Sequence, residues 1–129
     1  LAEAATPGDV KALKRFADLC RKRLDKHDVP GVFLADSGFH LQIALRCGNR
    51  CLYEIMERLD AKVQLMRLVH CRSLDRIEKS LRSHNELVDA IADRDGARAA
   101  AVVERHIEES WPRNMETVET AWQAQEKCG

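Results

Sequence analysis

The chain has 129 residues, with 21 Lys plus Arg, 21 Asp plus Glu and a net charge of zero. This balance indicates neither a basic nucleic-acid-binding surface nor an acidic tail. Charged residues make up 33% and aromatic residues only 5%, a composition typical of a helical bundle. No apolar run approaches the roughly 18 residues of a transmembrane helix, and no signal peptide is recognisable. We therefore expect no membrane partner and a single domain over residues 1–129.

Helices are predicted in chain order from apolar residues at alternating three- and four-residue intervals. The first starts at Thr6 and Pro7, a capping residue and a residue suited to the first helical position. It is expected to end near His27-Asp28. Val29-Pro30-Gly31 then reads as a turn, and the second helix is expected to follow it and to run to about Cys47.

The second half of the chain continues the helical pattern. Gly48 is a natural helix stop and Asn49 a natural N-cap for the third helix. That helix carries a wide apolar face from Leu52 to His70, which suits a central helix or one that meets a partner. We read His70 as a residue near the last carbonyls of the helix. The fourth helix is expected after Ser73, which can cap it.

A fifth helix is predicted from about Gly96, with Ala99, Val103 and His106 on its inward stripe. Pro112 then kinks this helix or begins another one. The fold class predicted by the whole pattern is all-α, an antiparallel bundle of about six helices.

The cysteine pattern indicates a reducing compartment. The chain has five cysteines, an odd number spread through helical segments, which argues against a secreted disulfide framework. We therefore expect a cytoplasmic protein. Cys47 and Cys51 are four residues apart, but Gly48-Asn49 interrupts the helix between them, so ordinary thiols are the preferred reading.

Four polar residues interrupt the apolar stripes. Asp36 and His40 are four residues apart and share one helix face, while His84 and His106 each replace an apolar residue on a core-facing stripe. Singly, each reads as a hydrogen-bonded core residue. Together they would be costly to bury, at about 1–3 kcal/mol for each unsatisfied group. A divalent ion at the bundle centre would offset this cost; zinc is the first expectation, with nickel, manganese, cobalt and iron as alternatives.

The ligand set alone leaves several functions open. Four protein ligands on a tetrahedral ion would make a structural site, whereas open positions could accept water or the carboxylate of a small organic acid. A metal-dependent hydrolase is less favoured, because no His-Glu-x-x-His signature supplies a general base; we expect no enzyme. A structural or interaction bundle without metal is the other alternative.

The order of these motifs carries a resemblance. The matching pieces are Asp36-Ser-Gly-Phe-His40, Gly48-Asn49, His84 with Asp89-Ala90-Ile91, Asp95-Gly96-Ala97-Arg98-Ala99, and Arg105-His106-Ile107. In this order across residues 6–110, they resemble the FCD domain. That domain is the C-terminal effector-binding domain of one branch of the GntR superfamily of bacterial transcription regulators.

The resemblance implies a metal-containing sensor domain. Asp36, His40, His84 and His106 would be the metal ligands, and a small carboxylate metabolite would bind beside the ion. Its binding would shift an N-terminal winged helix-turn-helix on DNA, usually within a homodimer. DNA would be contacted only through that N-terminal domain, which is absent from this chain, as is most of the opening FCD helix. Ser83 also departs from the Glu that is common there in the family.

Effector contacts are predicted among polar residues that can bind a carboxylate. The candidates are Arg46, Asn49, Arg67, Arg72 and Asn85. Asn49 and Arg67 are the two that we favour.

Overall fold

Every regular element in the part of the chain that the structure describes is a helix, as the apolar spacing predicts. The structure is a computed structural model that describes residues 1–70 and 73–109, without the side chains of 68–70. A 3-10 turn, η1 (Ala2–Ala4), precedes α1 (Pro7–Leu24), α2 (Val29–Arg46), α3 (Arg50–His70) and α4 (Leu74–Ala92), and one more helix covers residues 96–109. No described helix is long and apolar enough to span a bilayer. The helix expected around Pro112 lies outside the described residues.

Local chemistry sets several of the helix ends as predicted. The Thr6 hydroxyl accepts a hydrogen bond from the Asp9 backbone at 3.2 Å, and the Asp9 carboxylate accepts one from the Thr6 backbone at 2.9 Å. This reciprocal capping box satisfies two amides that the first turn leaves without helical partners. Gly48 has a φ of +74° after α2, a conformation that glycine adopts at little cost. Asn49 then caps α3 by accepting from the Leu52 backbone at 3.0 Å.

The start of α2 differs from the prediction. The expected turn at residues 29–31 is helical, because α2 begins at Val29. Asp28 is the N-cap, and its side chain accepts a hydrogen bond from the Gly31 backbone at 3.0 Å. Pro30 lies in the first helical turn, where a missing N–H costs nothing. The prediction of a turn at Val29-Pro30-Gly31 is therefore wrong, since proline marks both helix starts and turns.

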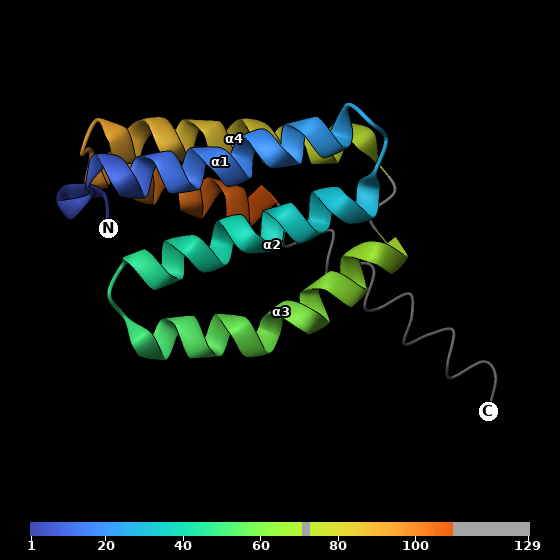
Figure 1. Cartoon of the computed structure of the whole chain (residues 1–129), viewed down its shortest axis with the longest axis horizontal. Coiled ribbons are helices and arrows are strands. Elements are labelled where there is room, and N and C mark those ends of the chain that lie inside the picture. Colours follow the sequence, from blue (N-terminus) through green and yellow to red (C-terminus); the bar gives the residue numbers. More distant parts are fainter. Residues whose placement is uncertain (71–72, 110–129) are drawn as a thin grey trace.

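The helices pack in a defined order (Figure 1). α1 contacts both α2 and α4, and α2 also contacts α3, so α2 lies between α1 and α3. The main core cluster includes Leu13, Phe39 and Ile91, which are at most 2% exposed. It lies between α1, α2 and α4, and Ala99 and Val102 extend it to the helix over residues 96–109.

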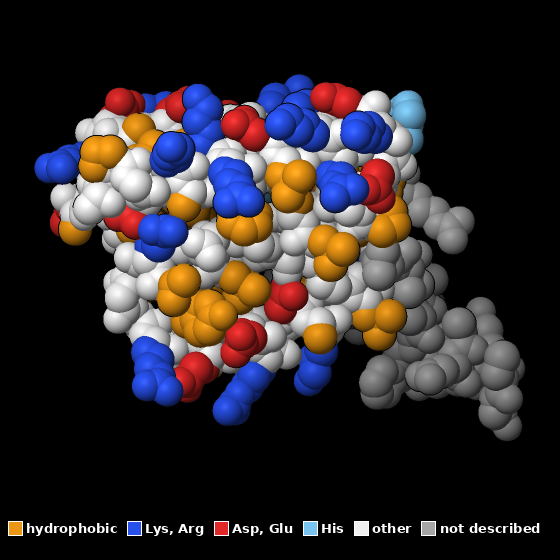
Figure 2. Space-filling model, viewed as in Figure 1, with side chains coloured by type: hydrophobic (Ala, Val, Ile, Leu, Met, Phe, Trp, Pro, Cys, Tyr) orange, Lys and Arg blue, Asp and Glu red, His pale blue; other side chains and the backbone are white. Residues whose placement is uncertain are grey.

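The placement of α3 decides between the two positions expected for it. No side chain of residues 50–67 is buried, and Leu52, Ile55 and Leu59 are 40%, 55% and 49% exposed. The expectation of a central helix is therefore wrong, and α3 lies at the edge of the bundle. Apolar side chains are visible at the surface over α2 and α3, whereas Lys and Arg side chains dominate over α1 (Figure 2).

The inward face of the helix over residues 96–109 is also shifted from the prediction. Val102 is 5% exposed and Val103 is 37% exposed, so the expected inward position of Val103 is wrong. The alanines that precede it give little contrast between faces, which explains why the apolar spacing did not fix the register. His106, which was predicted on the same inward stripe, is half-buried.

Candidate metal centre

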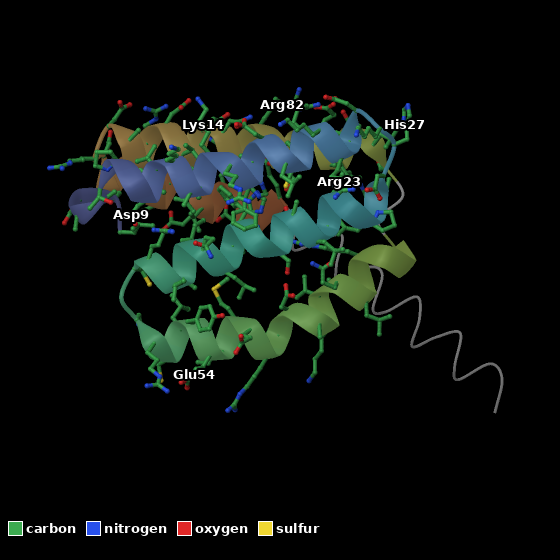
Figure 3. The ribbon with its side chains drawn as sticks, in the orientation of Figure 1. Asp9, Lys14, Arg23, His27, Glu54 and Arg82 are labelled. Atoms are coloured by element: carbon green, nitrogen blue, oxygen red, sulfur yellow. The ribbon has the colours of Figure 1, made fainter. Side chains whose placement is uncertain are left out.

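Three imidazole rings from three helices meet in the middle of the bundle. His40 comes from α2, His84 from α4 and His106 from the helix over residues 96–109. The ring centroids are 5.0 Å apart for His40 and His84, 5.3 Å for His84 and His106, and 5.6 Å for His40 and His106. One nitrogen from each ring lies within 4.8 Å of the other two. By contrast, the labelled Lys14 and Arg82 point away from the bundle (Figure 3).

Asp36 lies beside two of these rings, one turn before His40 on α2. Its Oδ1 is 3.4 Å from His84 Nε2, and its Oδ2 is 3.7 Å from His40 Nε2. Two donor atoms on one zinc ion, each bound at about 2.0–2.2 Å, lie roughly 3–3.6 Å apart in a tetrahedral shell. Each carboxylate oxygen therefore lies near one imidazole nitrogen, while the group whose donor atoms all lie within 4.8 Å of one another is the three histidines.

His84 shows most directly that this group of residues fits a metal ion. The residue is 1% exposed, and its ring stacks on Phe39 with centroids 4.3 Å apart. Neither ring nitrogen has a hydrogen-bond partner among the described residues; the Asp36 contact lacks hydrogen-bond geometry. Leaving a buried polar group unsatisfied costs about 1–3 kcal/mol. A metal bound to one nitrogen would relieve this cost, so the donor set and its surroundings fit a divalent ion.

The electrostatics keep the imidazoles in the form that binds metals. Burial lowers the pKa of His84 to about 3 and that of His106 to about 4, and burial also lowers the pKa of His40. The rings are therefore neutral at pH 7, and metal ligation requires a neutral ring nitrogen. Burial raises the pKa of Asp36, but neighbouring groups, the Arg67 guanidinium among them, lower it more, so this carboxyl remains ionised.

A cation from α3 neutralises Asp36. The Arg67 guanidinium donates a hydrogen bond to Asp36 Oδ2, and the side chains of Arg67 and Asp36 are 24% and 7% exposed. This contact joins residues 31 positions apart. No local pattern could predict it, although Arg67 is one of the two residues favoured for effector contact.

Three of the other effector candidates lie elsewhere. Asn49 is exposed and its side chain caps α3. Arg46 pairs with Asp9, and Asn85 is exposed on α4. Arg72 lies outside the described residues. Among the described candidates, the structure thus places Arg67, and not Arg46, Asn49 or Asn85, against Asp36 beside the histidine cluster.

Residues that flank the cluster have structural partners. Ser83, at the position where the family commonly has Glu, is buried and donates a hydrogen bond to the Lys79 carbonyl at 3.3 Å. Cys20 is fully buried near Asp36, and burial raises the pKa of its thiol to about 12. Its Sγ contacts the Val32 carbonyl at 3.8 Å, and the group of possible metal ligands among the described residues is the three histidines.

Comparison with known proteins agrees with the sequence resemblance. Residues 1–109 match the family described as the FCD domain, and no curated protein matches the chain. FCD domains belong to regulatory proteins, which are generally not enzymes. The match covers most of the chain and includes Asp36 and the three histidines of the cluster. The chain therefore belongs to the FCD domain family, consistent with the C-terminal effector-binding domain of a GntR-type transcription regulator.

Proposed function

We propose that this domain binds one divalent metal ion through Asp36, His40, His84 and His106 and uses it to sense a small carboxylate metabolite. Zinc is the first expectation, because three imidazoles and one carboxylate suit it. Nickel, manganese, cobalt and iron remain alternatives, since availability and geometry select among these ions more than ligand type does. The bound ion would supply a positive charge that attracts the carboxylate of the metabolite.

The single observation that carries this proposal is the buried His84. Its two ring nitrogens have no hydrogen-bond partner among the described residues, and His40, His106 and Asp36 surround it. An ordinary core position would favour an apolar residue there. An imidazole that is buried, neutral and directed at two others is explained by a shared ligand.

Arg67 supports the choice of a carboxylate as the sensed group. Guanidinium groups bind carboxylates through parallel hydrogen bonds, and Arg67 lies against Asp36 while keeping 24% of its side chain exposed. Asn49 caps α3 from an exposed position, so Arg67 is the residue that we propose for the effector contact. As in GntR-type regulators, metabolite binding would control a winged helix-turn-helix on DNA, and we expect the regulator to act as a homodimer.

The metal content of the purified chain tests the metal site. About one divalent ion per chain is expected after purification without chelators or nickel resin. His84→Ala should lose this ion. The exposed His27 provides the control; its φ is +55°, so it is best replaced by Asn, and His27→Asn should keep the metal. A His84→Ala variant with full metal content would refute the ligand set.

A second experiment tests the sensing function. The melting temperature is measured with a panel of small organic acids, once with the metal-loaded chain and once with chelator. A ligand that binds only the folded state raises the melting temperature by mass action. We expect stabilisation by carboxylic acids only in the loaded chain, and equal shifts with and without metal would contradict the proposal.

A further inference from the structure

We infer that Arg67 and the metal ion compete for the same carboxylate, so that metal binding loosens the attachment of α3 to the bundle. This inference rests on the proposed metal site and adds a regulatory role for Arg67. It follows from the position of the buried Asp36 carboxylate, which lies between Arg67 and the proposed site of the metal ion.

Asp36 contacts both the histidine cluster and a cation from another helix. Its side chain is 7% exposed, so its charge must be compensated within the protein. Arg67 provides that compensation through its guanidinium. With neutral imidazoles, the pair of Asp36 and Arg67 has no net charge.

A divalent ion changes this balance. Bound to the histidines beside Asp36, it would add two positive charges to a centre that Arg67 already neutralises. The two cations repel each other, and both draw on one carboxylate in surroundings with little water to screen the repulsion. Arg67 should therefore oppose metal binding, and metal should weaken the contact between Arg67 and Asp36.

This contact is one of few that hold α3 in place. Among the described side chains, α3 is joined to α2 by hydrogen bonds from Ser37 to Asp60, from Gln64 to the Phe33 carbonyl at 2.7 Å, and from Arg67 to Asp36. No side chain of residues 50–67 is buried, so apolar packing anchors α3 less firmly than it anchors α1, α2 and α4. Weakening one polar contact should therefore lower the free energy needed to open the whole helix.

The same change would prepare the site for its ligand. A guanidinium released from Asp36 offers its donors to an incoming carboxylate next to the ion. Arg67 would then act as a positioning residue that links three events: metal loading, metabolite binding and the attachment of α3.

The test compares metal affinity in three variants of the chain by competition with a chromogenic zinc chelator. Arg67→Met removes the charge and keeps the length, and it should bind zinc about tenfold or more tightly than the wild type. Arg67→Lys keeps the charge and should stay near the wild-type affinity. Arg46→Met is the matched control, because Arg46 also pairs with a carboxylate, Asp9, and has a similar side-chain exposure of 28%; it should leave zinc affinity unchanged.

Four outcomes would overturn the inference. Zinc binding by Arg67→Met that is unchanged or weaker would show that Arg67 does not oppose the metal, while the proposed metal site would stand. Equal tightening in Arg67→Lys would show that charge is not the cause. If Arg67→Met does not fold without metal, circular dichroism follows its folding during zinc titration; folding with zinc supports the inference, and failure to fold at saturating zinc overturns it. A wild-type chain that binds no divalent ion would overturn the proposed function as well.

Hydrogen exchange provides a readout that does not depend on affinity. Amides of α3 in the wild type should exchange several-fold faster with zinc than without it, while those of α1 become more protected. In Arg67→Met, zinc should no longer accelerate exchange in α3. Uniform protection of α3 by zinc in the wild type would contradict the loosening.

Discussion

At the scale of the residue, His84 is a side chain placed at a cost to stability. It occupies a core position on α4, stacks on Phe39 and leaves both ring nitrogens without hydrogen-bond partners among the described residues. Replacing it with an apolar residue of similar size removes the unsatisfied polar group. We therefore expect His84→Leu to raise the free energy of unfolding of the metal-free chain by about 1–2 kcal/mol and to abolish metal binding.

Urea denaturation in the presence of chelator measures this change. In the same experiment with zinc, the wild type should be more stable than His84→Leu, because only the wild type gains stability from the ion. A loss of stability in metal-free His84→Leu, of the size expected for a misfitting core residue, would show that the imidazole has a stabilising partner instead.

The buried histidines also predict how the stability of the metal-free chain depends on pH. Burial lowers the pKa of His84 from 6.5 to about 3. Below pH 6.5 the unfolded chain therefore takes up a proton that the folded chain does not bind. The free energy of unfolding should fall as pH falls from 6.5 towards 4, by about 1.4 kcal/mol per pH unit for His84 alone. Above pH 7 neither state binds this proton, and the dependence disappears.

His106 and Asp36 also contribute to the pH dependence of the free energy of unfolding, and their contributions can be distinguished. His106, whose pKa is also lowered by burial, adds to the slope over the same range. Asp36 has a pKa below its ordinary value of 3.8, so its contribution is lost only in stronger acid, as pH falls below that value. Denaturation with chelator at pH 7, 6 and 5 measures the slope, which should be shallower in His84→Leu. A flat profile in the wild type would contradict buried neutral imidazoles.

At the scale of the element, α3 is the helix with the weakest attachment. It contacts α2, and among the helices with defined bounds it has no comparable packing on α1 or α4. Its residues 50–67 include no buried side chain. Backbone opening should therefore require less free energy in α3 than in α1, which contributes the fully buried Leu13 and Cys20 to two core clusters.

Hydrogen exchange of the metal-free chain measures this difference directly. Amides in the middle of α3 should exchange at least about tenfold faster than those in the middle of α1, since each 1.4 kcal/mol of opening free energy changes the rate tenfold. The middle of α4, which also faces the core, is the internal control. Equal protection of α3 and α1 would show that α3 is anchored by contacts other than its three polar links to α2.

The same elements show what the sequence could and could not predict. Apolar spacing and caps such as Thr6 and Asn49 fixed most helices, because helix formation depends largely on neighbours in the sequence. Edge or centre placement of α3 was not predictable, since an apolar face is compatible with burial by the bundle and with exposure. The sequence did not show whether Val102 or Val103 faces the core, because the alanines before them do not distinguish a buried face from an exposed one.

The candidate site also has a part that the sequence could predict and a part that it could not. His84 was conspicuous because a polar residue interrupts an apolar stripe, and the structure brings it to His40 and His106. The pairing of Arg67 with Asp36 joins two helices that meet only through tertiary packing. Periodicity reports which face of a helix is buried, but it does not report which partner that face meets.

At the scale of the whole molecule, the net charge is zero, so the proposed recognition of an anion depends on the local charges at the centre of the bundle. With neutral imidazoles, a divalent ion together with Asp36 and Arg67 leaves two positive charges in the loaded site. A ligand with two negative charges would neutralise them, and one with a single charge would leave one uncompensated in surroundings where that is costly. The loaded domain should therefore bind dicarboxylates more tightly than monocarboxylates of the same length, and amides least of all.

Thermal shifts of the zinc-loaded chain with succinate, butyrate and butyramide test this order. At equal concentrations, succinate should raise the melting temperature most and butyramide least, because a tighter ligand of the folded state stabilises it more. Arg67→Met removes one positive charge and should narrow the difference between succinate and butyrate, while Arg46→Met, whose partner is Asp9, should leave it unchanged. An order set by apolar size, with butyramide and butyrate equal, would show that the pocket selects shape and not charge.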